Sequence, residues 1–360
     1  MRALPDLAIA LIATPPDAAT AGTFDARVYA LSPANVEFLR ALGAWQALPP
    51  ERLAPVHAMR IFGDDANASL EFDAYEAGVP ALAWIVEDSA LQRALWSGLA
   101  AMPRRCDRLE VRANHALISF ADGGALSAKL VIGADGAHSF VRAAAGIEAT
   151  DREYQQAAVV ANFRCEKPHR NAAYQWFQVG AVLALLPLPG DQVSMVWSLP
   201  AAEGQRVATL EPQGLAREVE EAAHGVLGAL KVTTAPRSFP LRRLCARRLV
   251  APRIALVGDA AHVIHPLAGQ GLNLGLQDVR LLAEILAGRE GGRDPGDYRL
   301  LRRYERRRAE PIAAMDAVVS GLFSLYGTRN GFVGRLRNAG LNLTDRLPVL
   351  KNILMRQAMN

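Results

Sequence analysis

The stretch "LVGDAAHVIHPLAGQGLNLGLQD", residues 256–278, is the part of the chain that decides the fold class. Its apolar start indicates a buried strand that ends at Gly258-Asp259, and its second half has the spacing of a helix. A strand, a glycine-rich turn and a helix in this order are typical of a doubly wound α/β sheet. Such sheets bind ligands in the crevice at the carboxyl ends of their strands. The stretch therefore predicts a Rossmann-like domain with a ligand site at this turn.

The residues of this turn favour a particular kind of ligand. The Asp259 carboxylate can accept hydrogen bonds from the hydroxyl groups of a ribityl or ribose chain. Pro266 interrupts the backbone before the helix, and Gly269 and Gly271 leave bare amide groups at the helix N-terminus. Those amides and the helix dipole stabilise negative charge, as on a flat ring that becomes anionic when it is reduced. An ordinary glycine-rich turn is the alternative, and the motif length of about twenty residues counts against it.

The composition is that of a globular chain. Its 360 residues are 51% hydrophobic, enough for a large core. The 40 basic and 36 acidic residues are spread along the chain, which does not favour a nucleic-acid partner, because such a partner would need a concentrated basic stripe. The three cysteines, Cys106, Cys165 and Cys245, form no CxxC pair and predict reduced thiols in a cytosolic protein.

No apolar run is long enough to predict a transmembrane helix. The longest, "GAVLALLPLPG", has about ten residues, whereas a span needs about 20. Near the start, "LAIALIA" (residues 7–13) follows Pro5 and Asp6, and no convincing cleavage site comes after it. We therefore interpret this run as a buried strand and not as a signal peptide.

Patterns before the opening stretch indicate alternating strands and helices. A helix is predicted to begin with Ser32 as its N-cap and Pro33 in its first position. A second helix begins at Asp88 or Ser89. Residues 109–133 alternate around "ADGG" and predict a hairpin. A strand, a turn and a short helix follow in "LVIGADGAHSFVRAAAG".

Two further regions complete the predicted organisation. From about residue 154 to 250 the sequence pattern changes. Here "YQWFQVGAVLALLPLPGDQVSMVWSLP" predicts two strands around a Pro-Gly-Asp turn, hence an antiparallel sheet. The helix over 271–287 is predicted to bury one apolar face. That face comprises Leu272, Leu276, Val279, Leu282 and Leu286.

Several segments resemble motifs of a known family. The opening stretch with its neighbours, "ALVGDAAHVIHPLAGQGLNLGLQDV", looks like the second flavin-binding motif of the FAD-dependent aromatic hydroxylases. More narrowly, it resembles the UbiH/UbiF/VisC group, which hydroxylates the ring of ubiquinone precursors. "DARVYALSPANVEFLRALGAW", "VEDSALQRALW" and "KLVIGADGAHSFVR" are similar to further family segments, and "LNLTDRLPVLKNILMRQAMN" resembles the tail of the narrower group. The resemblance covers nearly the whole chain in order.

The resemblance implies which residues bind FAD. Arg27 would contact the flavin nucleotide, and Gln92 stands where the family has a flavin-contacting glutamine. Asp135 of the Asp-Gly motif would help to bind FAD and the nicotinamide donor. No catalytic side chain is assigned. The expected cofactor-binding residues are Arg27, Gln92, Asp135, Gly136, Gly258, Asp259, Pro266, Gly269, Gln270, Gly271, Leu272 and Asn273.

The predicted fold class is α/β. It combines a Rossmann-like FAD-binding domain that lacks its N-terminal strand and helix, an inserted mixed or antiparallel β-sheet substrate domain, and a C-terminal helical tail. Residues 1–150 form the first part of the FAD-binding domain, with substrate-domain elements near 55–85. Residues 151–250 form the antiparallel-sheet substrate domain, 251–290 the second part of the FAD-binding domain, and 291–360 the C-terminal helices.

The residues singled out from the sequence also have simpler interpretations. Asp135-Gly136 can form a turn and an N-cap, Arg27 can be a surface ion-pair partner, and Gln92 can be a solvated helix residue. His262 and His265 form an HxxH pattern without a third ligand, so we interpret them as loop or pocket residues and predict no metal site. A run of arginines is expected on a solvated helix face or, less favourably, against lipid headgroups. They are Arg302, Arg303, Arg306, Arg307 and Arg308.

The chain departs from the family's pattern at its start. The family opens with a strand and a GxGxxG turn that are not found here, and Ala13 stands where an acidic residue would hold the adenosine ribose. Because that strand is central in such sheets, its absence leaves two strand edges unpaired, and each buried unpaired group costs about 1–3 kcal/mol. Either the natural chain begins upstream of Met1, which we favour because the rest of the site is intact, or a shortened chain binds FAD weakly or not at all.

The resemblance implies an FAD-dependent monooxygenase that uses NAD(P)H and O₂ to hydroxylate the aromatic ring of a polyprenylphenol in ubiquinone biosynthesis. Two alternatives stay open: a flavin-free scaffold or binding subunit of a quinone-biosynthesis assembly, and a hydroxylase of a soluble aromatic acid. The expected location is cytoplasmic, with a basic amphipathic tail that either contacts the inner face of the membrane or packs on its own domain. Tyr174, Trp176 and Trp197 either cover the substrate or belong to the core.

Overall fold

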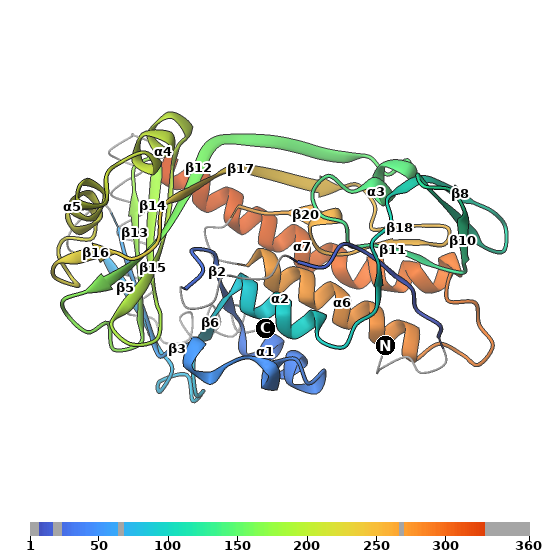
Figure 1. Cartoon of the computed structure of the whole chain (residues 1–360), viewed down its shortest axis with the longest axis horizontal. Coiled ribbons are helices and arrows are strands. Elements are labelled where there is room, and N and C mark those ends of the chain that lie inside the picture. The colour runs from blue at the N-terminus through green and yellow to red at the C-terminus, as the bar shows by residue number, and fades with distance from the viewer. Residues whose placement is uncertain (1–6, 17–23, 64–67, 266–269, 328–360) are drawn as a thin grey trace. The chain divides into compact units, whose positions relative to one another are not determined.

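The computed structural model describes residues 7–16, 24–63, 68–265 and 270–327 (Figure 1). The chain divides into two compact units, each assembled from separate stretches. The first unit comprises Met1–Asp17, Trp96–Arg152 and Arg242–Val319, and the second comprises Ala18–Leu95, Glu153–Leu241 and Ser320–Asn360. The chain passes from one unit to the other within β12 (Ala149–Cys165) and within β17 (Arg237–Ala246). The division into four domain segments stays a prediction.

Parallel strands form the centre of the first unit. β11 (Val131–Gly133) pairs in parallel with β19 (Ile254–Leu256), and β18 (Val250–Ala251) joins β19 in antiparallel orientation. A separate parallel sheet joins β1 (Leu11–Ile12) to β7 (Ala101–Met102). Parallel strands that alternate with helices along the chain confirm the predicted α/β class.

Two of these strands have a single neighbour each among the described residues. Within the described residues, β11 pairs only with β19 and β1 pairs only with β7. The strand predicted over residues 7–13 is reduced to the two residues of β1, and Ile9 is largely exposed. A strand with a neighbour on one edge only makes fewer ladder hydrogen bonds, which explains why the predicted strand is shortened here.

α6 (Gly271–Ala287) begins and ends at the predicted residues. Its predicted apolar face is wrong in one respect, because Val279 is 42% exposed whereas Asp278 is fully buried. The pattern could not reveal this, since a carboxylate is stable inside a protein only where other groups bond to it. Those partners come from distant parts of the chain and are described with the site.

A hairpin and two more helices complete the first unit. The predicted hairpin is confirmed as β9 (Ala116–Phe120) and β10 (Ala125–Ala128), with Gly123 and Gly124 at positive φ in the turn. The other elements are β8 (Cys106–Val111), α3 (Phe140–Ala144), η3 (Gly258–Ala260), β20 (His262–Val263) and α7 (Tyr298–Gly327).

Most of the second unit is one large sheet. β13 (Ala172–Gln178), β14 (Ala181–Pro187) and β15 (Gln192–Pro200) form an antiparallel run beside β12. The prediction of two strands in this region is wrong. A third strand exists because Val179-Gly180 makes a turn in which Gly180 has a φ of 75°, a conformation that favours glycine. The sheet continues through β4 (Ala58–Phe62) and β5 (Ser69–Asp73), and β16 (Leu230–Val232) pairs with β12.

Two helices cover one face of this sheet. α4 (Ala201–Ala208) and α5 (Pro212–Ala222) bury Val207, Leu215 and Val219 in a core with the sheet's aliphatic and aromatic side chains. Tyr174, Trp176 and Trp197 all belong to that core. Their place in it favours the core interpretation of these aromatic residues over a substrate contact.

A small sheet and the predicted capped helix form the rest of the second unit. β6 (Ala83–Glu87) lies between β2 (Val28–Leu31) and β3 (Ala54–Val56). α1 (Pro33–Ala41) has Ser32 as its N-cap, whose hydroxyl accepts from the Asn35 amide at 3.4 Å, as predicted. The second predicted helix is α2 (Asp88–Trp96), and the short helices η1 (Trp45–Ala47) and η2 (Pro50–Arg52) lie between β2 and β3 in the chain.

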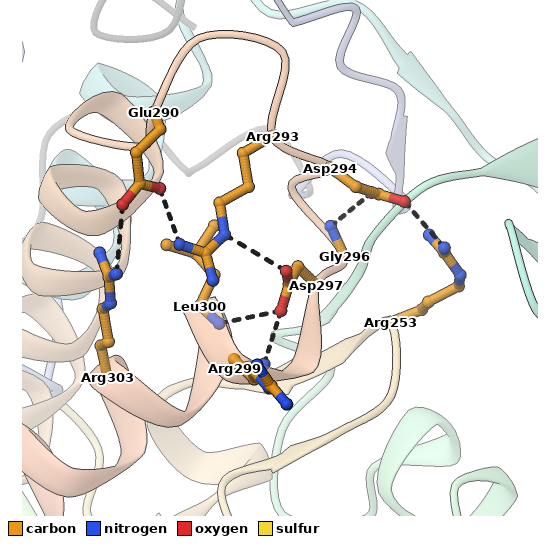
Figure 2. Close-up of polar contacts among 9 residues, drawn as sticks. All are labelled: Arg253, Glu290, Arg293, Asp294, Gly296, Asp297, Arg299, Leu300 and Arg303. Atoms are coloured by element: carbon orange, nitrogen blue, oxygen red, sulfur yellow. Dashed lines mark hydrogen bonds and ion pairs between the residues drawn. The ribbon is translucent and has the colours of Figure 1, made fainter.

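Arg253 fastens the loop between α6 and α7 to other segments of the first unit (Figure 2). Its guanidinium donates to the carbonyl oxygens of Ala113 (3.0 and 2.8 Å) and Lys129 (2.9 Å) and to the Asp294 carboxylate (2.8 Å). Asp294 also accepts from the amide of Gly296 at 2.9 Å. The loop lies so close that a Cβ on Gly296 would be 2.0 Å from the Lys129 oxygen. This cluster therefore fixes the position of the segment before α7 relative to the starts of β11 and β19.

We expect replacement of Asp294 by asparagine to weaken the pH dependence of stability in acid. Burial alone would raise the pKa of Asp294, but the bonds from Arg253 and Gly296 outweigh it and lower that pKa. The ionised group therefore stabilises the fold above its unfolded pKa, about 3.9, and this contribution is lost as pH falls through the folded value. Urea unfolding from neutral pH to about pH 2 should show the two proteins converging in acid. The exposed Asp107→Asn is the control, and a constant gap across this range would contradict the assignment.

None of the helices in the described part of the chain is long and apolar enough to cross a membrane.

Candidate functional site

The two acidic motifs predicted from the sequence lie at one edge of the first unit's sheet. Because β11 and β19 are parallel, with Gly133 opposite Leu256, the residues that follow them leave the sheet on the same side. Asp135-Gly136 follows β11, and Gly258-Asp259 follows β19. Both glycines have positive φ, 79° and 57°, which favours glycine in each turn. The structure thus brings together two motifs that are far apart in the sequence.

Arg142 of α3 ties these two turns to each other. Its guanidinium donates to the Ala137 oxygen at 2.8 Å and to the Ala260 oxygen at 2.9 Å. One planar side chain therefore fixes the spacing of the Asp-Gly turn and the Gly-Asp turn. No role was predicted for Arg142 from the sequence, although it is the last residue of the motif "KLVIGADGAHSFVR".

Replacing Arg142 by lysine should leave the fold intact but weaken FAD binding by about tenfold, because a single ammonium group cannot serve two carbonyl oxygens in the geometry of a guanidinium fork. Quenching of flavin fluorescence during titration measures the affinity. Arg248→Lys, at an exposed arginine of the same unit, is the matched control. Equal affinity in both variants would show that the spacing of the turns does not depend on Arg142.

Asp135 has bonding partners within its own turn. One oxygen of its carboxylate accepts from the Ser139 hydroxyl at 2.5 Å, and the other accepts from the Val141 amide at 3.1 Å. Ser139 is in turn the N-cap of α3, since its hydroxyl accepts from the Arg142 amide at 2.9 Å. These contacts match the turn-and-cap alternative, and a contact of Asp135 with FAD or the nicotinamide donor stays a prediction.

A buried polar cluster lies behind the Gly258 turn. The Asp278 carboxylate accepts from the Gly258 amide at 2.9 Å and lies 2.7 Å from Nε2 of His262, both through the same oxygen. Its second oxygen accepts from Nε of Arg308 at 2.6 Å. Arg308 also donates to the Gln277 side chain at 3.0 Å and to the Leu274 carbonyl at 3.2 Å. The carboxylate therefore has a donor on each oxygen, which compensates for its loss of water.

Two predictions change with this cluster. Arg308 was expected on a solvated face but is only 5% exposed, because α7 turns it toward Asp278. His262 is a buried partner of Asp278 in β20 and not a loop residue. His265 is buried as well, and burial lowers its pKa to about 4, so its ring is neutral at physiological pH. In the described residues no group of His, Cys, Asp or Glu side chains is arranged to hold a metal ion.

α7 supports the strand that leads into the turn at two more points. The Tyr304 hydroxyl donates to the Leu256 carbonyl at 2.8 Å, and Glu305 accepts from the Leu249 amide at 2.8 Å. With Arg308, these residues lie along one buried side of the helix. α7 thus acts as a rigid support for the Gly258 turn, a role that the sequence analysis did not foresee.

The N-terminus of α6 faces this edge of the sheet without a side-chain cap. Gln270 is the N-cap residue, and its own side chain makes no capping hydrogen bond. Leu272 is half-buried and Asn273 is buried at the start of the helix. A Cβ on Gly275 would be 3.2 Å from the Gly258 Cα, so helix and turn approach backbone to backbone. The predicted residues Pro266 and Gly269 lie outside the described residues.

Arg27 and Gln92 belong to the second unit, where their neighbourhoods are joined. The Asp25 carboxylate accepts from the Arg27 amide at 3.0 Å and from the Ser89 amide, at the start of α2, at 3.3 Å. Asp25 is held in turn by Glu87, which accepts from its amide at 2.6 Å and is itself paired with Arg52 at 2.8 Å.

The side chains of Arg27 and Gln92 contact residues that are close to them in the sequence. The Arg27 guanidinium lies over the Tyr29 ring, and the Gln92 amide donates to Asp88 at 2.8 Å. The flavin contacts of Arg27 and Gln92 stay predictions, and Glu87 is a buried acid that the sequence analysis missed.

The residue types at this edge of the first unit are suited to binding a flavin. Two glycine turns at the carboxyl edge of parallel strands leave backbone open to a ligand, and α6 begins without a capping hydrogen bond from the side chain of its N-cap residue, Gln270. The close approach of Gly275 to the Gly258 Cα leaves little space for a side chain on Gly275 and holds the turn close to the helix. Such a site favours a planar group that carries negative charge over a bulky or cationic one.

Comparison with known proteins agrees with this chemistry. Residues 20–318 match the family described as FAD binding domain. The 3-demethoxyubiquinol 3-hydroxylase of Escherichia coli is 34% identical over 347 residues, which cover 93% of this chain and 87% of that protein. The ubiquinone hydroxylase UbiL of Rhodospirillum rubrum is 33% identical, with 96% and 82% covered. The ubiquinone biosynthesis monooxygenase COQ6 of Drosophila melanogaster is 32% identical, with 94% and 80% covered.

Solved structures share the fold at lower sequence identity. Klebsiella pneumoniae HpxO, complexed with FAD and uric acid, superposes with a TM-score of 0.71 at 18% identity and covers 91% of this chain and 87% of that one. PqsL of Pseudomonas aeruginosa, described as a probable FAD-dependent monooxygenase, gives a TM-score of 0.71 at 22% identity, with 88% and 90% covered.

Proposed function

This chain belongs to the FAD binding domain family, among the flavin-dependent hydroxylases of ubiquinone biosynthesis, and on that premise we propose that it hydroxylates the aromatic ring of a polyprenylphenol intermediate. The single observation that carries the proposal is its similarity, above 30% over more than nine-tenths of the chain, to relatives named for that reaction. NAD(P)H and O₂ are the expected co-substrates. The organisation of the first unit around two glycine turns supports FAD as the cofactor.

The residues that would hold FAD are those at the strand ends and at the start of α6. Asp259 would accept hydrogen bonds from the polyol chain, and the amides of Gly271 and Leu272 would stabilise negative charge on the ring. When bound, FAD supplies the redox chemistry and the activation of O₂. The chain's own contribution is then to fix the turns, through Arg142 and Asp278, and to exclude water.

We also propose contact with the surface of the cytoplasmic membrane. A polyprenylphenol is very apolar, so an enzyme that acts on it gains from lying close to the bilayer. The exposed arginines of α7, Arg303, Arg306 and Arg307, supply positive charge that anionic headgroups would attract. Sedimentation with vesicles of phosphatidylglycerol, compared with vesicles of neutral phosphatidylcholine, tests this contact. Equal sedimentation with both would contradict it. Membership of a ubiquinone-biosynthesis complex is a further expectation from the relatives' pathway.

The function itself is tested with the purified full chain in three steps. FAD is added, and the visible spectrum is recorded after removal of free flavin. NADH and NADPH oxidation and oxygen uptake are then measured with a short-chain prenylphenol and with a soluble phenolic acid. Mass spectrometry follows the gain of one oxygen atom in the ring. Hydroxylation of the prenylphenol supports the proposal. Turnover of the phenolic acid alone would favour a soluble substrate, and no flavin absorbance would favour a flavin-free binding subunit.

A further inference from the structure

We propose that Asp278 is a positioning residue that sets the conformation of the Gly258 turn, and through it the backbone amides that FAD would meet. The inference rests on the proposed function for its cofactor, but its structural content concerns the chain alone. Asp278 was not among the expected cofactor-binding residues. It is fully buried, and its carboxylate has three partners from three separate elements, η3, β20 and α7.

The two oxygens of Asp278 have different tasks. One serves the turn, since it accepts from the Gly258 amide at 2.9 Å and contacts His262 at 2.7 Å. The other accepts from Arg308 at 2.6 Å. The Arg308 guanidinium thus balances the negative charge of the carboxylate from the side opposite the turn. Asp278 can therefore hold an amide in place without leaving an uncompensated charge behind the turn.

The Gly258 turn needs such a holding group. Gly258 has a φ of 57°, and its amide donates to the Asp278 side chain of α6 rather than to the carbonyl of a neighbouring strand. The α6 backbone contacts the turn from the same side, because a Cβ on Gly275 would be 3.2 Å from the Gly258 Cα. Packing against Gly275 fixes the distance of the turn from the helix, and the Asp278 bond fixes its rotation. The turn in this way sets where the residues that follow it, beginning with Asp259, leave the sheet.

A purely electrostatic role for Asp278 predicts something different. If the residue only neutralised Arg308, removal of both charges together would leave the turn unaffected. If it positions the turn, the essential feature is an acceptor for the Gly258 amide, charged or not. The two roles can therefore be separated with paired substitutions that remove both charges and differ only in whether an acceptor is kept.

The experiment compares Asp278→Asn/Arg308→Met with Asp278→Leu/Arg308→Met in the full chain. In the first double variant, the introduced amide oxygen can accept from Gly258 while its NH₂ group faces the methionine. In the second, no acceptor is left. We expect the second variant alone to lose FAD affinity, by about tenfold, as measured by flavin fluorescence quenching. It alone should also show faster hydrogen exchange at the Gly258 amide.

The controls separate this inference from the proposed function. Asp122→Asn removes an exposed ion pair with Arg104 elsewhere in the first unit and should change neither the affinity nor the exchange at Gly258. Equal behaviour of the two double variants in both measurements would overturn the inference. If the unaltered chain does not bind FAD, the proposed function fails, and the exchange rates still decide whether Asp278 positions the turn.

A second variant tests the turn without any buried charge. Gly275→Ala places a methyl group against the Gly258 Cα and should push the turn away from Asp278, with faster exchange at the Gly258 amide and weaker FAD binding. Because alanine favours a helix more than glycine does, the helix itself should not be weakened. Unchanged exchange and unchanged affinity in this variant would contradict the inference, whether or not the double variants fold.

Discussion

Replacement of Arg308 by methionine is expected to lower the free energy of unfolding by about 3–5 kcal/mol, the usual cost of leaving one member of a buried ion pair without its partner. Asp278 would lose the charged partner of one carboxylate oxygen at a position with no access to water, and α7 would lose three bonds to α6. Urea unfolding followed by circular dichroism measures the change. The loss should be recovered in large part when Asp278 is also replaced, because the uncompensated charge is then gone.

The control for this prediction is Arg307→Met. It changes the same residue type by the same substitution one position earlier in α7, but Arg307 is exposed. A change within about 0.5 kcal/mol is expected there. Similar losses for Arg307→Met and Arg308→Met would mean that the effect comes from the helix and not from the buried pair.

Replacement of Gly133 by valine should cost about 3 kcal/mol and should disrupt the site as well as the fold. A Cβ at this position would be 2.8 Å from Cδ2 of Leu256 and 2.9 Å from Cβ of Val141. The Val141 atom is fixed by the α3 backbone, so β11 must shift relative to β19 or α3 must move. Both turns of the site follow these elements, and FAD affinity should fall together with stability. Thermal unfolding and flavin titration are the two measurements.

Gly291→Val is the matched control for overpacking. A Cβ at Gly291 would meet no atom within 4 Å, and its φ lies outside the positive range. Little loss of stability is expected there. If Gly133→Val proved as mild as this control, the close packing of β11, β19 and α3 would not be a constraint on the molecule.

Local signals in the sequence predicted the elements well where one short segment decides the outcome. α6 begins and ends as predicted, and Ser32 caps α1, because helix period and capping depend on residues a few positions apart. The third strand between residues 172 and 200 was missed because its turn contains a single glycine, Gly180, inside a nearly continuous apolar run. An apolar run of that kind does not show by itself where one strand ends and another begins.

The site was predicted in its motifs but not in the bonds that hold them. Arg142 reaches a carbonyl 118 positions away, and Arg308 pairs with a carboxylate 30 positions away. No local period encodes such pairs, and a basic run such as the one in α7 most often marks a solvated face. The same limit explains why Asp278 was passed over in favour of Val279 as a buried residue. Burial of a polar side chain can be predicted only when its hydrogen-bonding partners are known.

The way in which the first unit is put together has a consequence for biosynthesis. β11 and β19 are neighbours in space, yet the whole of residues 153–241 is translated between them. While the ribosome makes that insertion, β11 lacks its partner β19, and parallel pairs of this kind form slowly because a long loop must close first. The nascent chain is therefore most exposed to misassembly in this interval. Chaperone dependence should be governed by the arrival of β19 and α7, and truncation just before residue 254 should give an aggregation-prone product.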